Sequence, residues 1–272
     1  MREQQEPLLP AERHRRIQQL LDERNVMRVS AMSELLGVSE VTIRRDLEEL
    51  ERRGVLERIH GGAISSRRLR SEPRYLEAMT SHAEEKRDIG RAAAALVEPG
   101  DTLFFNGGTT TLEVFRHLDG PNLRVVTNHV GVPLEVGDRE LDLIVVGGQY
   151  RAPSNSLVGP FAVDALRRMH ATKAFIGVEG ISLRSGATTP SASEAEIARL
   201  MIERTRGDVI LVADSSKIGA VADFVVTGLD EVTALVTDRG IDREFADGLA
   251  EAGVRVVVAE PAVAERRSGR SG

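Results

Sequence analysis

The stretch VSEVTIRRDL, residues 38–47, decides how the N-terminal part of the chain folds. It follows Gly37, which ends a short apolar-periodic segment at 29–36, and its own apolar residues recur every third or fourth position. Ser39 has a side chain that typically caps the start of a helix, and glycine suits a tight turn between helices. The pattern predicts two helices joined by a sharp turn, the second covering residues 39–50.

The flanking sequence predicts a winged helix-turn-helix. Residues 11–24 also show helical apolar spacing, and Gly54 ends the helix that contains the quoted stretch. Residues 55–64 suit two short strands around a Gly61-Gly62 turn, which is the pattern of a β-wing. In a helix-turn-helix, the second helix enters the major groove of DNA, and its N-terminal residues contact base edges.

Polar side chains near the start of this second helix suit DNA contacts: Ser39, Thr42, Arg44 and Arg45. Arginine bonds O6 and N7 of guanine through two N–H groups, and hydroxyl groups bond phosphates or bases. Asp46, in the same helix, is expected to orient an arginine rather than to touch DNA. At this point a protein–protein module with a chance arginine pair is the alternative.

The net charge of the chain argues against binding to nucleic acid, but the distribution of charged residues along the chain favours it. The 272-residue chain has a net charge of −6, but residues 1–70 hold 14 Arg against 12 Asp and Glu. Residues 52–70 contain six Arg and a single acid, Glu57. An acidic body therefore carries a compact basic segment, which is typical of a DNA-binding region, although a solvated run of charges has the same composition.

The composition also excludes several classes of protein. The chain has no Cys, which excludes disulfides, thiolate metal sites and a cysteine nucleophile. No apolar run approaches the roughly 20 residues that span a bilayer, and the N-terminus lacks the apolar stretch of a secretory signal. We therefore expect a cytoplasmic protein.

From residue 84 the sequence alternates apolar runs with helical stretches. A helix at 84–96 precedes seven apolar runs, at 102–105, 124–127, 141–146, 173–178, 208–213, 234–237 and 255–259. Continuous apolar strands separated by helices indicate a mainly parallel sheet covered on both faces. The expected fold is an N-terminal all-α winged helix-turn-helix (11–66), a linker (67–83), a C-terminal α/β domain with a mainly parallel sheet (84–260) and a disordered tail (261–272).

Small and polar residues follow five of these runs. Ligands of open α/β sheets bind beyond the carboxyl ends of the strands, and glycines at a helix N-terminus suit an anion. The candidate ligand-binding residues are Gly107, Gly108, Thr109, Thr110, Thr111, Thr127, Asn128, Gly147, Gly148, Arg151, Glu179 and Lys217. Each fragment alone also suits an ordinary loop. Together they supply donors, an acid and two cations, which suits a small anionic, hydroxylated ligand such as a sugar phosphate.

Both halves of the chain resemble the DeoR family of bacterial transcription regulators. The quoted stretch, followed by RIHGGA at 58–63, is similar to the DNA-binding signature of the family over about residues 11–66. The strings GGTTT, VVTN, GVEGIS and ADSSK resemble its effector domain over about residues 84–238. That domain is similar in fold to sugar-phosphate isomerases.

The resemblance implies roles for particular residues. Its DNA contacts fall on Ser39, Thr42, Arg44 and Arg45, and on a wing with Arg58, His60 and Gly61 that lies against the DNA backbone or a minor groove. It also implies a phosphate at 107–111 and a sugar pocket lined by Thr127, Asn128, Glu179 and Lys217. We expect a repressor whose partners are double-stranded operator DNA and a phosphorylated sugar, acting as a homodimer or homotetramer.

The alternative is a sugar-phosphate isomerase with an appended DNA-binding domain. Isomerisation needs a base poised near neutral pH and a second group that handles the hydroxyl protons. The isomerases resembled here carry a cluster of acids at this strand end, whereas GVEGIS offers Glu179 alone. The six His show no metal-ligand spacing. We expect no catalytic residue, no metal and no cofactor.

Overall fold

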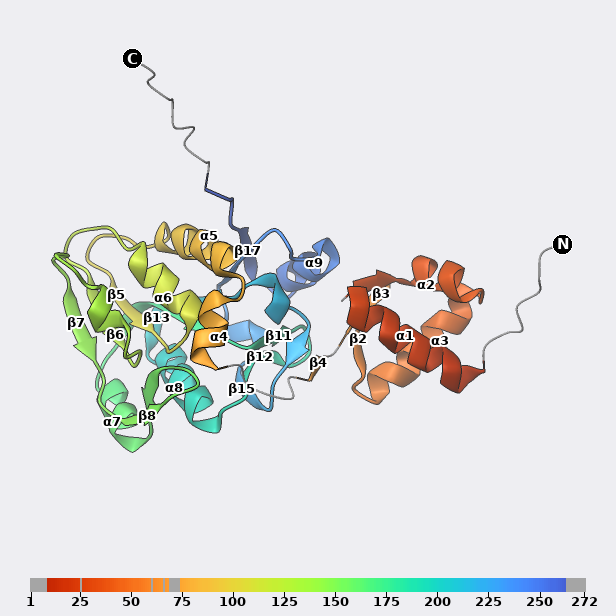
Figure 1. Ribbon diagram of the computed structural model, residues 1–272, viewed down its shortest axis with the longest axis horizontal. Coiled ribbons are helices and arrows are strands. Elements are labelled where there is room, and N and C mark those ends of the chain that lie inside the picture. Colours follow the sequence, from red (N-terminus) through yellow and green to blue (C-terminus); the bar gives the residue numbers. More distant parts are fainter. Residues whose placement is uncertain (1–8, 25, 60, 66, 69–73, 263–272) are drawn as a thin grey trace, which may run out of the picture.

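The computed structural model describes residues 9–24, 26–59, 61–65, 67–68 and 74–262, which form an N-terminal and a C-terminal domain (Figure 1). The N-terminal domain contains α1 (Pro10–Arg24), α2 (Val29–Leu36) and α3 (Glu40–Arg52). Its antiparallel sheet has the order β1 (Val26–Arg28), β3 (Gly62–Ser65) and β2 (Leu56–Ile59). Apolar side chains of all three helices meet in one core, among them Ile17, Met32, Ile43 and Leu47.

The turn between α2 and α3 forms as the sequence predicts. Gly37 ends α2 in the left-handed conformation, with φ +66°, and donates its N–H to the carbonyl of Ser33. The wing differs slightly from the expectation. Gly62 pairs with Ile59 and belongs to β3 rather than to the turn. A Cβ atom at Gly62 would lie 2.5 Å from the carbonyl oxygen of Met27, so the close approach of β1 explains the glycine.

A seven-stranded parallel sheet forms the centre of the C-terminal domain. Its order is β17-β16-β13-β10-β5-β6-β7, and every neighbouring pair is parallel. The strands are β5 (Thr102–Phe105), β6 (Arg124–Thr127), β7 (Asp142–Val145), β10 (Ala171–Gly177), β13 (Thr205–Val212), β16 (Ala234–Thr237) and β17 (Arg255–Val258). Each of the seven predicted runs is one of these strands.

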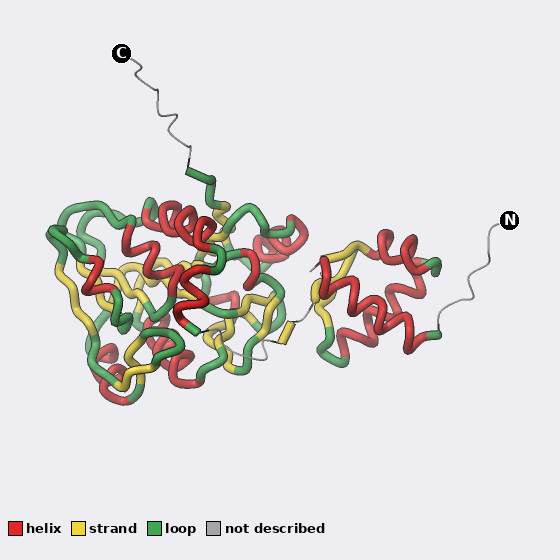
Figure 2. Tube along the Cα trace, in the orientation of Figure 1, coloured by secondary structure: helices red, strands yellow, loops and turns green. Residues whose placement is uncertain are grey.

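Helices cover both faces of this sheet, as Figures 1 and 2 show. One face carries α5 (Ala83–Ala94) and α6 (Thr109–Arg116), and the other carries α7 (Pro160–Arg167), α8 (Ala192–Glu203) and α9 (Arg243–Glu251). Successive strand residues point to opposite faces. Accordingly, Phe104 packs in the core beneath α7, α8 and α9. Leu103 and Phe105 pack in the core beneath α5 and α6.

Short elements that the sequence did not predict surround the carboxyl ends of the strands. A hairpin joins β8 (Gln149–Arg151) to β9 (Ser156–Val158). A small antiparallel sheet combines β11 (Gly180–Ser182), β12 (Gly186–Thr189) and β15 (Phe224–Thr227). Single-turn 3₁₀ helices cover Val132–Glu135, Ser215–Lys217 and Leu229–Glu231.

The segment expected as a linker contains regular structure. β4 (Arg67–Arg68) pairs in parallel with β14 (Ala220–Val221) of the C-terminal domain, and α4 (Tyr75–Thr80) packs on α6. The carboxylate of Glu77 accepts the N–H of Arg74 at 3.3 Å, which caps α4. The structure ends at Ala262, so most of the expected tail lies outside the described residues. Within the described ranges, no helix is long and apolar enough to cross a membrane.

Candidate functional site

The start of α3 presents the predicted DNA-reading side chains. The Ser39 hydroxyl accepts the N–H of Thr42 at 3.2 Å and lies 2.9 Å from the Thr42 hydroxyl. Arg44 donates to Glu40 one turn earlier, at 2.9 Å. Arg45 is exposed and has no ion-pair partner among the residues that the structure describes. Both arginines are therefore exposed, and the surface pair of Arg44 with Glu40 is weak enough to be exchanged for another acceptor.

A buried carboxylate, Asp46, holds α3 against α1. Its two oxygens accept Nε and Nη2 of Arg13 at 2.5 and 3.0 Å, and His14 Nε2 lies 2.9 Å from Oδ1. Asp46 thus orients an arginine, as expected, but that arginine lies on α1 and not on the reading helix. The contact fixes the direction in which α3 presents Arg44 and Arg45.

The wing carries two of its three predicted residues in the described part of the chain. Arg58 donates from Nη1 to Glu48 at 3.1 Å, which links β2 to α3. The carbonyl of Gly61 accepts the N–H of Val29 at 2.8 Å, and its φ of +84° suits the tight turn. His60 lies outside the described residues.

In the C-terminal domain, a small polar cavity of about 60 Å³ lies at the carboxyl ends of β5 and β10. Six of the predicted residues line it: Gly107, Gly108, Thr109, Thr110, Glu179 and Lys217. Other lining residues, which the sequence did not single out, are Tyr75, Ala78, Lys86, Pro153, Ser154, Gly177, Val178, Thr189 and Glu194. The cavity therefore combines the N-terminus of α6, two lysines and two carboxylates.

The wall formed by residues 107–110 suits an anion. Gly108, with φ +151°, is the N-cap of α6, so the first N–H groups of the helix have no intrahelical acceptor and carry partial positive charge. A Cβ atom at Gly107 would lie 2.5 Å from Cβ of Ser156. Only glycine lets the β8–β9 hairpin approach this wall so closely.

Two lysines and a carboxylate supply charge to the cavity. Lys217 forms an ion pair with Glu179. The 3₁₀ turn that carries Lys217 begins at Asp214, whose Oδ1 accepts the N–H of Ser216 at 3.1 Å. Lys86 is 5% exposed and donates to the carbonyls of Ala78 and Ser81, at 2.5 and 2.8 Å. Burial lowers the pKa of Lys86. Nothing in the charged sequence around Lys86 distinguishes it from its neighbours, because its burial depends on how α4 packs.

Helix α4 closes one side of the cavity. Tyr75 Oη lies 3.0 Å from Nε2 of His129, which is fully buried. The N–H of Gly131 donates to Nδ1 of His129 at 2.9 Å, so the neutral ring carries its proton on Nε2 and donates it to Tyr75. Burial lowers the pKa of His129 to about 4 and raises that of Tyr75.

Six further predicted residues do not line the cavity, and several of them bond the backbone instead. The hydroxyl of Thr111 donates to the carbonyls of Asn106 and Gly108, both at 2.9 Å. Thr127 donates to Phe105 at 2.7 Å, and Asn128 donates to Leu157 at 2.9 Å.

The other three of these residues lie further along the chain. Gly148 packs against the backbone of Val158, where a Cβ atom would approach its carbonyl oxygen to 2.6 Å, and Gly147 has open space around it. Arg151 pairs with the lining residue Glu194 at 3.3 Å. Arg151 also donates to the hydroxyl of Ser154 at 3.3 Å, so it contacts two residues of the cavity wall without lining the cavity itself.

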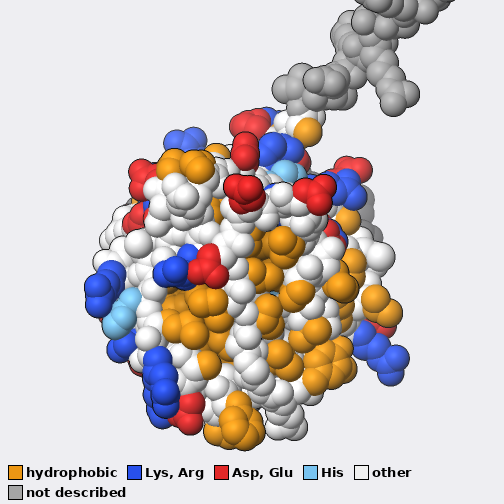
Figure 3. All heavy atoms as spheres, turned by 90° about the vertical axis from the view of Figure 1, so that its left-hand side faces the viewer, with side chains coloured by type: hydrophobic (Ala, Val, Ile, Leu, Met, Phe, Trp, Pro, Cys, Tyr) orange, Lys and Arg blue, Asp and Glu red, His pale blue; other side chains and the backbone are white. Residues whose placement is uncertain are grey.

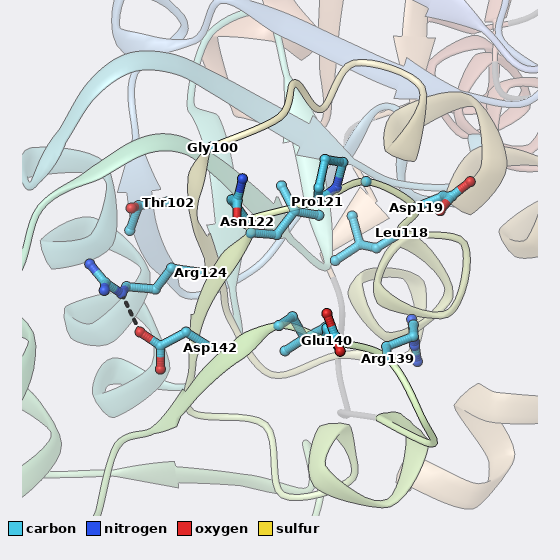
Figure 4. Close-up of a pocket in the computed structure, with 13 residues that line it drawn as sticks. Gly100, Thr102, Leu118, Asp119, Pro121, Asn122, Arg124, Arg139, Glu140 and Asp142 are labelled. Carbon is cyan, nitrogen blue, oxygen red and sulfur yellow. Dashed lines mark hydrogen bonds and ion pairs between the residues drawn. The ribbon is translucent and has the colours of Figure 1, made fainter.

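A larger open hollow of about 820 Å³ lies at the opposite end of the sheet, near the start of β5, β6 and β7 (Figure 4). Arg124 pairs with Asp142 at 2.6 Å, and Arg139 donates to the carbonyls of Phe115 and Val136 at 2.7 and 3.0 Å. Its cations are thus engaged within the chain. Ligands of parallel sheets bind at carboxyl ends, so the smaller cavity is the better candidate. No group of three metal-ligating side chains occurs among the described residues.

Comparisons with known proteins agree with both halves of this description. Residues 13–68 match the family described as a DeoR-like helix-turn-helix domain, and residues 81–239 match the DeoR C terminal sensor domain. The HTH-type transcriptional regulator GlpR of Haloferax volcanii is 37% identical over 252 residues, which cover 92% of this chain and 98% of that protein. The HTH-type transcriptional regulator GolR of Listeria innocua is 31% identical, covering 93% and 100%.

A third relative, the putative aga operon transcriptional repressor of Escherichia coli O157:H7, is 32% identical and covers 91% of this chain and 93% of its own length. Among solved structures, ribose 5-phosphate isomerase A of Methanocaldococcus jannaschii is 13% identical, with a TM-score of 0.36 over 51% of this chain and 55% of that one. That likeness is too distant to support a conclusion. The chain therefore belongs to the DeoR family and is a DNA-binding transcription regulator, not an enzyme.

Proposed function

We propose that this regulator is a repressor and that a phosphorylated sugar, bound in the cavity beside α6, releases it from its operator. The observation that carries the proposal is the convergence of three sources of positive charge on one cavity. These are the N-terminus of α6, Lys86 and Lys217. Such a set suits a phosphate, because charge-assisted hydrogen bonds and a helix N-terminus both favour an anion.

The carboxylates of the same cavity suit the hydroxyl groups of a sugar. Glu179 and Glu194 line the cavity, and their carboxylates accept hydrogen bonds from hydroxyls. Asp214, which begins the turn that carries Lys217, has Oδ2 buried and without a hydrogen-bond partner in the described part of the chain. A ligand that carries both a phosphate and hydroxyl groups matches this combination of cations and carboxylates.

Ligand entry requires the cavity to open. Its volume of about 60 Å³ is well below the roughly 300 Å³ or more of typical small-molecule pockets. Helix α4 is the element best suited to move, since it has only six residues and none of them is buried. Besides its packing on α6, the contacts that hold it include those from Tyr75 to His129 and from Lys86 to the carbonyls of Ala78 and Ser81.

Movement of α4 would reach the DNA-binding domain by a short route. Only residues 69–73 separate Arg74, the cap of α4, from β4, and β4 follows the wing strand β3. Two relatives are named as repressors: the putative aga operon transcriptional repressor and GlcR of Bacillus subtilis. Their names support repression rather than activation. A ligand that prefers the open cavity by about 5.5 kcal/mol would switch the protein almost completely.

Calorimetric titration with pentose and hexose phosphates tests the ligand. We expect one of them to bind, and the same sugar without its phosphate to bind at least about 10-fold more weakly. Lys86→Met, Lys217→Met and the double variant Thr109→Ala/Thr110→Ala should each weaken binding to a similar extent, because each removes donors to the phosphate. Arg255→Met, at an exposed site on β17, is the control. Unchanged affinity in all three variants would refute the site.

Fluorescence anisotropy with DNA selected from a random library tests the regulation. The bound sugar phosphate should weaken binding to the selected DNA, and it should have no effect in the Lys217→Met variant. A ligand that tightens DNA binding would contradict release from the operator while leaving the ligand site in place.

A further inference from the structure

We propose that a second copy of this chain docks on the apolar end of the C-terminal domain formed by β7, the β8–β9 hairpin, α7 and the turn after β6. Figure 3 shows this end, with hydrophobic side chains across its middle and charged side chains mostly around its rim. We call it the β7 face. Its large exposed apolar side chains are Val130, Leu134, Val145, Tyr150 and Phe161.

These side chains lie on segments that contact one another. The N–H of Val130 donates to the carbonyl of Asn155 at 3.0 Å, and the Tyr150 hydroxyl donates to Oδ1 of Asn155 at 3.1 Å. Gln149, the first residue of β8, follows β7 after a short turn. Its Cβ atom lies 4.0 Å from the position that a Cβ atom of Gly159 would take, just before α7, so the hairpin also contacts the start of α7. These contacts join the turn after β6, the hairpin and the start of α7, so the segments that carry the apolar groups are neighbours.

The exposed fractions are large for side chains of this kind. Leu134 is 87% exposed, Phe161 78% and Tyr150 56%. With side-chain areas of about 150 to 250 Å², the five groups together expose on the order of 500 Å². A stable interface buries about 800 Å² on each partner, and the largest apolar patch of a typical monomer, about 300 to 600 Å², is often a functional surface. The apolar groups of the β7 face would thus supply more than half of the roughly 800 Å² that one partner of a dimer buries.

The edge strand itself also lacks a partner. β7 pairs only with β6 among the described strands, so one row of its N–H and C=O groups faces outward. Its sequence, DLIV, contains no Pro or Lys, which commonly protect an edge from pairing, and its one charged residue, Asp142, is paired with Arg124 of the neighbouring strand. An edge of this kind suits a twofold-related copy, because the same strand can pair with itself in the antiparallel sense.

The charges around the β7 face favour a second copy over a strongly charged partner. Arg124 pairs with Asp142 at 2.6 Å, and Arg116 pairs with Glu135 at 2.7 Å. Both ion pairs close within the chain, so the rim has no large excess of one sign. Two identical faces can therefore approach without like-charge repulsion. DNA binding also favours a dimer, because one winged helix reads few base pairs whereas a symmetric dimer reads two half-sites.

The β7 face also adjoins the cavity. The turn of the β8–β9 hairpin contributes Pro153 and Ser154 to the cavity wall, and its first strand contributes Tyr150 to the face. The interface and the proposed ligand would thus share one hairpin. The inference itself rests only on the surface, so it can fail while the sugar-phosphate proposal stands, and the reverse.

Sedimentation of the full chain, without DNA or sugar phosphate, tests the inference. The wild type should be a dimer or larger at about 1 µM. The double variant Val145→Glu/Phe161→Asp should raise the dissociation constant at least about 100-fold and at least halve the mass of the assembly. Both sites are exposed in the single chain, and an acid in the first turn of α7 suits the helix dipole, so the fold should survive.

Phe224→Asp is the matched control, because it removes an exposed phenylalanine from β15, outside the β7 face. It should leave the assembly intact, and circular dichroism should report equal melting of all three proteins. A wild type that stays monomeric at about 50 µM would overturn the inference. So would a double variant that assembles like the wild type, or a control that dissociates as readily as the double variant.

Discussion

Acidification should destabilise the C-terminal domain through one buried imidazole, His129. Burial, with a contribution from the nearby charge of Arg116, lowers its pKa to about 4, whereas the unfolded chain has a value near 6.5. The neutral ring accepts the N–H of Gly131 and donates to Tyr75. Protonation places a charge in a site with 0% exposure and leaves the Gly131 N–H facing a second donor.

The sign and the size of the effect follow from the two pKa values. Because the folded value lies below the unfolded one, the folded chain binds fewer protons between them. The stability from neutral His129 is therefore complete above about pH 6.5 and is lost as the pH falls toward 4. Between pH 7 and pH 5 the free energy of unfolding should fall by about 2 kcal/mol from this group.

Urea denaturation at pH 7, 6 and 5 measures this difference. His129→Gln keeps a hydrogen-bond donor and removes the titration, so the variant should lose about 2 kcal/mol less than the wild type over this range. His82→Gln, at an exposed position, should follow the wild type. Equal pH slopes for the wild type and His129→Gln would refute the reasoning, as would a His129 titration near pH 6.5 in the NMR spectrum of the folded protein.

Three further predictions concern ion pairs and DNA contacts. Arg45→Ala should cost about 1–3 kcal/mol on selected DNA and relax base preference, measured by anisotropy; an equal loss on random DNA would contradict base reading. Asp46→Ala leaves Arg13 buried without its carboxylate and should destabilise the N-terminal domain by about 3 kcal/mol, seen by circular dichroism in urea, while the second domain melts unchanged. Lys173→Met leaves Asp101, whose pKa is lowered by the pair, buried without its ammonium partner at 2.7 Å. It should cost about 3 kcal/mol, and a second change, Asp101→Asn, should restore part of the loss if the pair is the cause.

Local sequence was sufficient for the parts of the fold that depend on neighbouring residues. The left-handed turn at Gly37 and the cap at Ser39 depend on interactions within a few positions of the chain, and each of the seven parallel strands coincides with a continuous apolar run that is visible in the sequence. The small antiparallel elements of the C-terminal domain escaped prediction because their strands have three or four residues, and some take their partners from distant segments, as β12 does with β15. Short strands carry too little periodicity to be recognised.

The same distinction divides the candidate site. The sequence by itself predicted a helix start with Ser39, Thr42, Arg44 and Arg45 as candidate DNA contacts, and a turn at 107–110 that suits an anion, because backbone conformation and helix ends create both features. Only the tertiary structure decided that Lys86 and Tyr75 reach the cavity and that Thr127 and Asn128 bond backbone carbonyls instead. A buried polar group takes whichever partner the packing brings within reach, and segments far apart in the chain supply that partner.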